Sequence, residues 1–205
     1  MSDDIIRIAI TGKMRSGKTT AAKHLWTNYD FKILSFGEPI KRIADEYFKH
    51  LYEPIYENCP FSDNGESIAG YKKPRKLLQQ IGQLFRQIDE DVWIKRAEQT
   101  MKYYEQYRDT RGIVIDDMRQ PNEYEWARAN GFVIIRINAP DELRIERAKA
   151  VGDDFDINDL THETEKHVDT FAVDYEVSNS GDIRDLERQI DEIMTKLLSD
   201  KEAIV

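Results

Sequence analysis

Eight consecutive residues near the N-terminus form a pattern that binds phosphate groups. Residues 12–19 read Gly-Lys-Met-Arg-Ser-Gly-Lys-Thr, a full match to G-x-x-x-x-G-K-[ST]. An apolar run over residues 5–10 precedes this loop and a helical pattern begins at Thr20, so the loop is expected to join a strand to a helix. The glycines let backbone N–H groups point at phosphate oxygens, and the helix N-terminus adds partial positive charge. Lys18 would supply a cation for the β- and γ-phosphates of a nucleoside triphosphate, and Thr19 a hydroxyl ligand for Mg²⁺.

A second group of polar residues follows an apolar run at residues 112–115, which is typical of a buried strand in a parallel sheet. Asp116 and Asp117 come directly after it, followed by Met118 and Arg119. A carboxylate in this position beside a phosphate loop commonly orders Mg²⁺ or its waters. Because neighbouring strand residues point to opposite faces, one of the two aspartates is expected to face the site. Arg119 could clamp a phosphate, and the alternative is a polar strand terminus without chemistry.

The helix expected over residues 75–88 carries two stripes of side chains. Its apolar face consists of Leu77, Leu78, Ile81, Leu84, Phe85 and Ile88. A second, polar stripe consists of Arg75, Gln79, Gly82, Gln83 and Arg86. Arginine binds phosphate bidentately, glutamine presents a donor and an acceptor to a base edge, and a glycine between them leaves room for a ligand. The alternative is a solvated face on which Gly82 makes a helix–helix contact.

Two arginines lie three residues apart on the charged helix expected over residues 141–150. Arg144 and Arg147 therefore share one side of that helix. Phosphoryl transfer needs positive charge around the migrating group and exclusion of water, which two arginines on a movable segment would provide. The alternative is a set of weak surface ion pairs with Glu142 and Glu146.

Strands and helices alternate along the chain, which predicts a parallel sheet with helices on both faces. The expected strands cover residues 5–10, 32–36, 112–115, 132–137 and 175–177. The expected helices begin at residues 20, 39, 75, 91, 121, 141 and 182. Residues 52–74 break this pattern with three prolines and two glycines, as functional or mobile loops do.

The composition bounds the class of protein. A length of 205 residues suits one domain with a single core. The net charge of −9 argues against non-specific binding to duplex nucleic acid. The single cysteine, Cys59, excludes an internal disulfide and fits a reducing cytoplasm. Residues 1–4 include two aspartates and lead directly into the first expected strand, so we expect no signal peptide. No apolar run approaches the length of a membrane span.

Beyond the phosphate-binding loop, three segments together resemble the deoxynucleoside monophosphate kinases encoded by bacteriophages. These enzymes are relatives of the adenylate kinase and dephospho-coenzyme A kinase groups. The segments are Phe36-Gly37-Glu38-Pro39-Ile40-Lys41, Arg75-Lys76-Leu77-Leu78-Gln79-Gln80-Ile81-Gly82 with Arg86 and Trp93 after it, and Asp117-Met118-Arg119-Gln120-Pro121-Asn122-Glu123. The resemblance covers nearly the whole chain and is weaker in residues 52–72 and 151–172.

The resemblance implies a P-loop kinase with a three-layer α/β sandwich and a five-stranded parallel sheet. It implies one domain over residues 1–205, with a monophosphate-binding region at about 38–107 and a lid at about 140–172. The residues that would contact ATP are Gly12, Met14, Arg15, Ser16, Gly17, Lys18, Thr19 and Thr20. Residues 177–181 resemble the loop beside the adenine of ATP in these kinases.

The resemblance also implies roles for residues outside the loop. Those on the monophosphate side would be Arg75 and Arg86 at the phosphate, Gln79 or Gln83 at the base or sugar, and Phe36 and Lys41. The catalytic set would be Lys18, Asp117, Arg119, Arg144 and Arg147, with Thr19 and Asp117 at Mg²⁺. The doubled Asp116–Asp117 departs from the family pattern and leaves open which carboxylate acts.

The predicted function is transfer of the γ-phosphoryl group of ATP to a (deoxy)nucleoside 5′-monophosphate. The expected partners are ATP and that monophosphate, with no nucleic acid and no membrane, and a homodimer is left open. We expect a cytoplasmic protein, in the host cytoplasm if a phage encodes it. One alternative is a kinase like dephospho-coenzyme A kinase, whose hydroxyl acceptor would need a base such as Asp117. Another is a non-catalytic nucleotide-binding regulator, although the chain lacks the N-K-x-D sequence that reads guanine.

Overall fold

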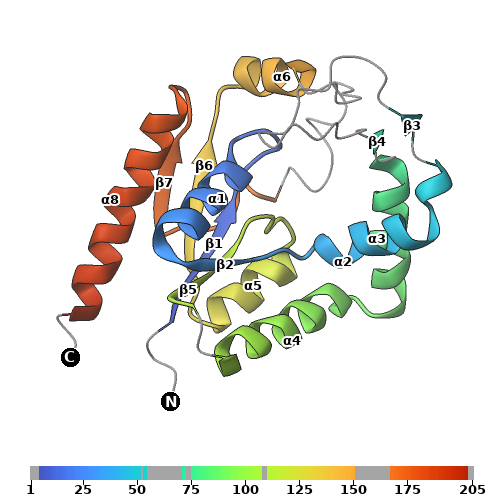
Figure 1. Ribbon diagram of the computed structural model, residues 1–205, viewed down its shortest axis with the longest axis horizontal. Helices are drawn as coiled ribbons and strands as arrows, with labels where there is room; N and C mark the ends of the chain where they lie inside the picture. The colour runs from blue at the N-terminus through green and yellow to red at the C-terminus, as the bar shows by residue number, and fades with distance from the viewer. Residues whose placement is uncertain are drawn as a thin grey trace. The chain divides into compact units, whose positions relative to one another are not determined.

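A computed structural model describes residues 5–51, 53–54, 71–72, 75–107, 110–150 and 167–202 (Figure 1). Its internal contacts divide the chain into two compact units. The first unit contains residues 1–36 and 94–205, and the second contains residues 37–93. The predicted boundaries of the monophosphate-binding region and the lid stay predictions.

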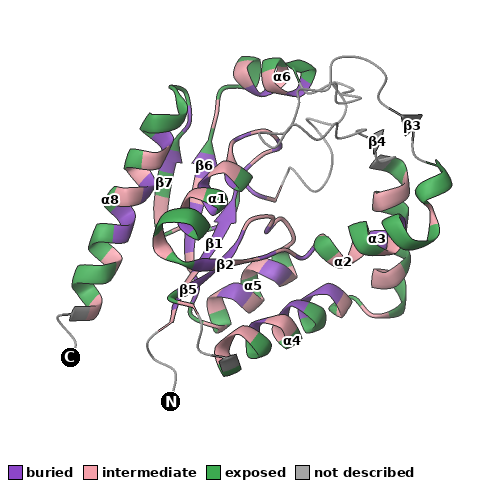
Figure 2. Ribbon diagram, in the orientation of Figure 1, coloured by how far each residue is buried: buried purple, intermediate pink, exposed green. Residues whose placement is uncertain are grey.

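The first unit contains the predicted five-stranded parallel sheet, which is confirmed. Its strands are β1 (Ile6–Thr11), β2 (Phe31–Leu34), β5 (Gly112–Ile115), β6 (Val133–Asn138) and β7 (Tyr175–Ser178). They lie in the order β2-β5-β1-β6-β7, and every neighbouring pair is parallel. All four residues of β5 are buried, as the uninterrupted apolar run predicted (Figure 2).

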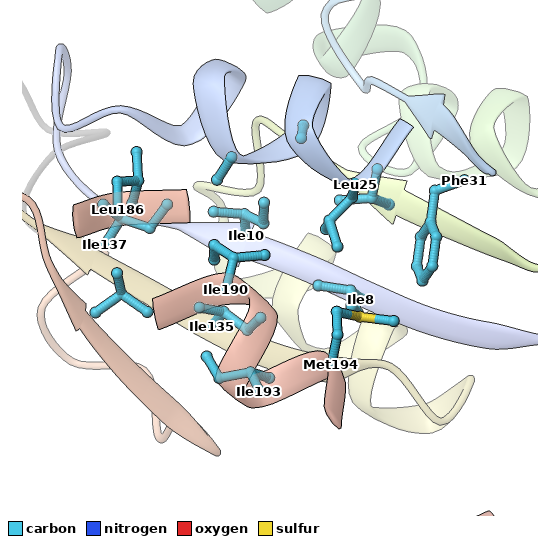
Figure 3. Close-up of a cluster of buried hydrophobic side chains, with 14 of the residues drawn as sticks. Ile8, Ile10, Leu25, Phe31, Ile135, Ile137, Leu186, Ile190, Ile193 and Met194 are labelled. Atoms are coloured by element: carbon cyan, nitrogen blue, oxygen red, sulfur yellow. The ribbon is translucent and has the colours of Figure 1, made fainter. Parts of the chain in front are cut away.

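Helices cover both faces of this sheet, again as predicted. The described helices of this unit are α1 (Lys18–Tyr29), α4 (Val92–Tyr107, whose first two residues belong to the second unit), α5 (Pro121–Ala129), α6 (Asp141–Ala150) and α8 (Ile183–Glu202), and all but α6 lie on the faces of the sheet. Ile8 and Ile10 of β1 pack with Leu25 of α1 and Ile190 of α8 in the main core (Figure 3). Arg7 points to the other face, where it donates to Glu105 of α4 and to the carbonyl of Asn130 after α5. The alternation along β1 therefore assigns α1 and α8 to one face, and α4 and α5 to the other.

The second unit is built around a pair of helices. It contains α2 (Glu38–Tyr47), the short 3-10 helix η1 (Lys49–Leu51), α3 (Arg75–Ile88) and the antiparallel strands β3 (Glu53–Pro54) and β4 (Tyr71–Lys72). Its core has buried Ala44 and Ile81, with partly buried Ile40, Ile43, Phe48, Leu77, Leu78 and Phe85 around them. Apart from β3 and β4, the irregular stretch predicted at residues 52–74 lies outside the described residues.

The apolar face predicted for α3 is packed in its middle and exposed at two of its positions. Leu84 is 57% exposed and Ile88 is 81% exposed. Leu84 lies at the edge of the packed stripe, and Ile88 lies beyond Phe85, the last α3 residue in the cluster. The packed part of α3 is thus shorter than its apolar pattern. Within the described ranges, no helix combines the length and the apolar character needed to cross a membrane.

Candidate active site

The predicted site residues of the first unit gather at one edge of its sheet. Because all five strands are parallel, their carboxyl ends meet at that edge. The phosphate-binding loop follows β1. Each of the other four strands has a polar residue at its carboxyl end, either as its last residue or directly after it. These polar residues are Ser35 after β2, Asp116 after β5, Asn138 at the end of β6, and Asn179 after β7.

The backbone of the phosphate-binding loop adopts left-handed conformations at three positions. Gly12 has φ 141°, Arg15 has φ 60° and Gly17 has φ 107°. A Cβ atom on Gly12 would collide with the carbonyl oxygen of Ile137, and one on Gly17 with the side-chain amide of Asn179. Both glycines are therefore required by close approach as well as by φ. Such a curled backbone forms a concave nest of N–H groups that binds anions.

Positive groups converge on this loop. Lys18 is 6% exposed, and its ammonium donates to the carbonyl oxygens of Gly12 at 2.6 Å and Lys13 at 2.7 Å. Helix α1 begins at Lys18, and its first turn contains no acidic side chain to neutralise the positive end of its dipole. The loop thus combines a cation with a helix N-terminus.

The loop also contains a buried donor that suits a phosphate. The hydroxyl oxygen of Ser16 is buried and has no hydrogen-bond partner among the described residues. Buried polar groups are almost always hydrogen-bonded, so an orphan inside a binding loop indicates a position where a ligand or water completes the bonding. Together with the nest and Lys18, this hydroxyl fits the phosphates of a nucleoside triphosphate.

The two adjacent aspartates have different partners. One carboxylate oxygen of Asp116 accepts a hydrogen bond from the Thr19 hydroxyl at 3.3 Å, and the other accepts one from the Ser35 hydroxyl. Asp117 accepts a hydrogen bond from the backbone N–H of Phe36 at 2.9 Å. The predicted Mg²⁺ ligand Thr19 therefore lies beside Asp116. The oxygen donors of Thr19 and Asp116 fit Mg²⁺, which usually takes one or two protein ligands along with phosphates and waters.

The segment that carries Arg119 is fixed at both ends. The hydroxyl of Thr11 in β1 donates to the carbonyl of Met118 at 3.1 Å. The carboxylate of Glu123, which is 4% exposed, accepts the backbone N–H groups of Arg119 at 2.8 Å and Gln120 at 3.0 Å. Glu123 thereby completes a capping box at the start of α5. The backbone from which the Arg119 side chain extends is held in one position.

Both arginines of α6 reach the phosphate-binding loop. Arg144 is 2% exposed, and it donates to the carbonyl of Met14 at 2.7 Å and to Asp141 at 2.6 Å. Arg147 donates to the carbonyl of Arg15 at 3.4 Å and to the carbonyl and side-chain oxygens of Asn179 at 3.3 and 3.2 Å. The alternative of surface ion pairs with Glu142 and Glu146 is wrong for Arg144, which is buried against the loop.

The predicted substrate-side residues are spread over the two units. Gln79, Gln83 and Lys41 are exposed on the second unit, where Arg86 is half-buried. The side chain of Arg75 lies outside the described residues. Phe36 lies in the first unit and is 3% exposed. Its ring packs edge-on against that of Trp126, with 6.0 Å between the ring centroids, so its side chain belongs to the core.

Gly82 makes the helix–helix contact that was the alternative to a ligand space. A Cβ atom there would lie 3.1 Å from Ile40 Cδ1 of α2 and 3.3 Å from an Arg86 guanidinium nitrogen. The indole N–H of Trp93 donates to the Gly82 carbonyl at 3.3 Å. The missing side chain therefore admits α2 and the guanidinium group of Arg86.

Ser35 contacts the site without a predicted role, and Asn179 was expected only as part of the loop at residues 177–181 beside the adenine. Asn179 donates to the carbonyl of Ser16 at 2.7 Å. Both residues follow a strand directly, as Asp116 does. The predicted bounds concealed this, because Ser35 lies inside the strand predicted at residues 32–36 and Ser178 follows the strand predicted at residues 175–177.

The phosphate-binding loop between β1 and α1, at the carboxyl edge of a five-stranded parallel sheet, is the arrangement of P-loop nucleotide-binding proteins. A family described as "AAA domain" matches residues 8–167, and the chain belongs to that family. A protein of Acanthamoeba polyphaga mimivirus named "Putative deoxynucleotide monophosphate kinase" is 29% identical over 145 residues, which are 66% of this chain and 75% of that protein.

Solved structures share the fold at low sequence identity. TT1252 from Thermus thermophilus is 20% identical with a TM-score of 0.58, and covers 95% of this chain and 99% of its own. Dephospho-CoA kinase from Campylobacter jejuni is 15% identical with a TM-score of 0.54, over 95% and 98% of the two chains. Shikimate kinase from Acinetobacter baumannii is 14% identical with a TM-score of 0.54, over 96% and 95%. These similarities establish the fold, and they do not identify the substrate that accepts the phosphoryl group.

Proposed function

We propose that this P-loop kinase transfers the γ-phosphoryl group of ATP to the phosphate of a (deoxy)nucleoside monophosphate, giving the diphosphate. The observation that carries the transfer is the contact of both α6 arginines with the phosphate-binding loop. The acceptor class is supported by the name of the mimivirus relative and by the polar stripe of α3. Two phosphate groups that approach each other repel strongly, and a cage of positive charge offsets this repulsion.

On the donor side, the loop residues would bind the triphosphate. The backbone nest between Gly12 and Gly17 would hold phosphate oxygens, and Lys18 would turn its ammonium group from the loop carbonyls to the β- and γ-phosphates. Thr19 and Asp116 would hold Mg²⁺, which when bound neutralises charge on those phosphates. We place Asp116 at the metal because its carboxylate is the one that contacts Thr19.

The two α6 arginines would have different roles. Arg144 is buried and paired with the carboxylate of Asp141, so it would anchor the helix to the loop. Arg147 is bound to neutral oxygens at 3.2 Å or more, and a phosphate is a stronger acceptor than these. Arg147 would therefore exchange its long contact with Arg15 for the migrating phosphoryl group and keep its contacts with Asn179. Its helix, with the rest of the lid at about 140–172, would exclude water from the reaction.

On the acceptor side, Arg75 and Arg86 would bind the monophosphate, and Gln79 or Gln83 would contact its base or sugar. Lys41 would add positive charge in the same region, about 38–107. Arg119 and Asp117 would lie between the two substrates. No general base is required, because the acceptor phosphate is already ionised at neutral pH.

An acceptor panel tests this proposal. Purified protein with ATP and Mg²⁺ would be offered each nucleoside and deoxynucleoside monophosphate and dephospho-coenzyme A, with ADP release and product identity as the readouts. We expect a diphosphate from at least one monophosphate. Phosphorylated dephospho-coenzyme A alone would assign the other kinase reaction, and ATP binding without any product would support a regulator.

A further inference from the structure

Asn179 connects three segments of the first unit that are far apart in the sequence. It follows β7 and is 5% exposed. Its side-chain N–H donates to the Ser16 carbonyl of the phosphate-binding loop at 2.7 Å, and its backbone N–H donates to the Asn138 carbonyl at the end of β6 at 2.7 Å. Its backbone and side-chain oxygens accept from Arg147 of α6. One residue thus contacts the loop, the sheet edge and the helix.

The orientation of the Asn179 amide follows from its partners. The NH₂ group must face Ser16, because a backbone carbonyl only accepts, and the oxygen must face Arg147, because a guanidinium only donates. The amide of asparagine meets both needs, because it has an NH₂ group that donates and an oxygen that accepts. The amide also lies directly on the loop, since a Cβ atom on Gly17 would collide with its nitrogen.

Arg147 depends on this residue more than on any other described partner. Two of its three described hydrogen bonds are to Asn179, and the third is to Arg15 at 3.4 Å. Arg144, by contrast, has the carboxylate of Asp141 and a short bond to Met14. The position of the Arg147 guanidinium beside the loop is therefore set largely by Asn179.

We propose that Asn179 is a positioning residue, which orders the phosphate-binding loop through Ser16 and places Arg147 beside that loop for the triphosphate. This inference rests on the proposed nucleotide site and is independent of the acceptor. Removal of the Asn179 amide would leave the buried Ser16 carbonyl without this donor. It would also remove the side-chain oxygen that accepts from Arg147 at 3.2 Å and leave only the backbone carbonyl of residue 179 for that arginine.

The test is a double-mutant cycle on ATP affinity, measured by calorimetry. Wild type, Asn179→Ala, Arg147→Ala and the double variant would be compared, with Asn28→Ala on the exposed surface of α1 as the matched control. We expect Asn179→Ala to weaken ATP binding about tenfold relative to Asn28→Ala, and the double variant to bind much more tightly than additive losses predict. Equal affinity of Asn179→Ala and Asn28→Ala, or additive losses, would overturn the inference. Wild-type protein that does not bind ATP would overturn the proposed function itself.

A second variant covers the case in which Asn179→Ala does not fold. Asn179→Asp keeps the shape and the acceptor for Arg147, but it loses the donor to Ser16. We expect a lower melting temperature than that of wild type, because a carboxylate oxygen would face the buried Ser16 carbonyl, and ATP binding weakened severalfold, with the KM for the acceptor unchanged. A variant that folds and binds ATP as tightly as Asn28→Ala would refute the role of the amide.

Discussion

The phosphate-binding loop and the α2–α3 pair differ in how their polar groups are held. In the loop region, Lys18 is 6% exposed and Arg144 is 2% exposed, and both donate to loop carbonyls. In the α2–α3 pair, Gln79 and Gln83 are exposed, and the core around the helices is small. The first region is preorganised by buried hydrogen bonds of its charged groups, whereas the glutamines predicted to contact the acceptor lie at the surface of the second.

This difference separates two tasks of a kinase. Preorganised donors stabilise charge in the transition state without reorganising, which suits the end of the site that handles the triphosphate. A helix pair with a small core opens locally at a lower free energy, which suits a region that adapts to its ligand. We therefore expect changes in the loop region to abolish phosphoryl transfer, and changes in the α2–α3 pair to alter acceptor binding.

The largest effect is expected for Lys18→Ala. Loss of the ammonium group removes positive charge from the β- and γ-phosphates, so kcat should fall by about 10³-fold while the melting temperature stays near that of wild type. Steady-state kinetics by coupled ADP release checks this. The control is Lys23→Ala, which removes an exposed lysine of the same helix. Turnover retained in Lys18→Ala would reject the assignment of the loop.

The next effect distinguishes the two aspartates. Asp116→Asn keeps the shape of the side chain but weakens the oxygen donor beside Thr19, so kcat should fall by about 10²-fold and the Mg²⁺ concentration for half-maximal rate should rise. Asp117→Asn should change the Mg²⁺ dependence far less, because Asp117 contacts the Phe36 backbone. Titration of the rate with Mg²⁺ measures both. A larger Mg²⁺ effect in Asp117→Asn would reverse the assignment.

A smaller effect is expected for Gly82→Ala in the second unit. The added Cβ would lie 3.3 Å from an Arg86 nitrogen and 3.1 Å from Ile40 Cδ1, so both side chains must shift by a few tenths of an ångström. The KM for the monophosphate should rise by about fivefold, because a displaced guanidinium binds phosphate with poorer geometry. The Kd for ATP should not change, and Gln80→Ala on the same helix serves as the control. Equal losses for ATP and acceptor would contradict the separation of tasks.

The smallest effect concerns stability in acid and leaves the site untouched. Burial raises the pKa of the Asp191 carboxyl, but hydrogen bonds from His24 and Tyr29 and the charge of His24 outweigh it, so the pKa lies below its ordinary value of 3.8. A lowered folded-state pKa stabilises the protein above the unfolded pKa, and this contribution is lost as pH falls through the folded value.

We therefore expect Asp191→Asn to lower the melting temperature at pH 7 by about 1–3 °C, a small shift because Asp191 is 46% exposed. The difference from wild type should shrink below about pH 4, as the wild-type carboxylate becomes protonated. Thermal unfolding between pH 3 and pH 7 measures it, with Asp200→Asn near the end of α8 as the control. A difference that stays constant over this range would show that the carboxylate charge is not involved.

Local patterns predicted most of the elements and the donor loop. The helix over residues 75–88 and the strand over residues 112–115 have the predicted bounds, because hydrophobic period and turn residues are local signals. The role of Gly82 was left open, because a glycine in a helix has the same sequence signal whether a ligand or a neighbouring helix approaches it. No local pattern shows which of Asp116 and Asp117 contacts Thr19, because Thr19 is 97 residues from Asp116 in the sequence and the two meet only in the folded sheet.

The amino-acid sequence by itself determined the alternation of strands and helices, the phosphate-binding loop and the class of chemistry, since these depend on residues close together in the chain. The tertiary structure decided which distant residues meet. The order β2-β5-β1-β6-β7 brings Thr19 to Asp116 across 97 residues, and Ser16 to Asn179 across 163 residues. Contacts over such separations form only when parallel strands align their carboxyl ends, so they depend on the packing of the whole sheet.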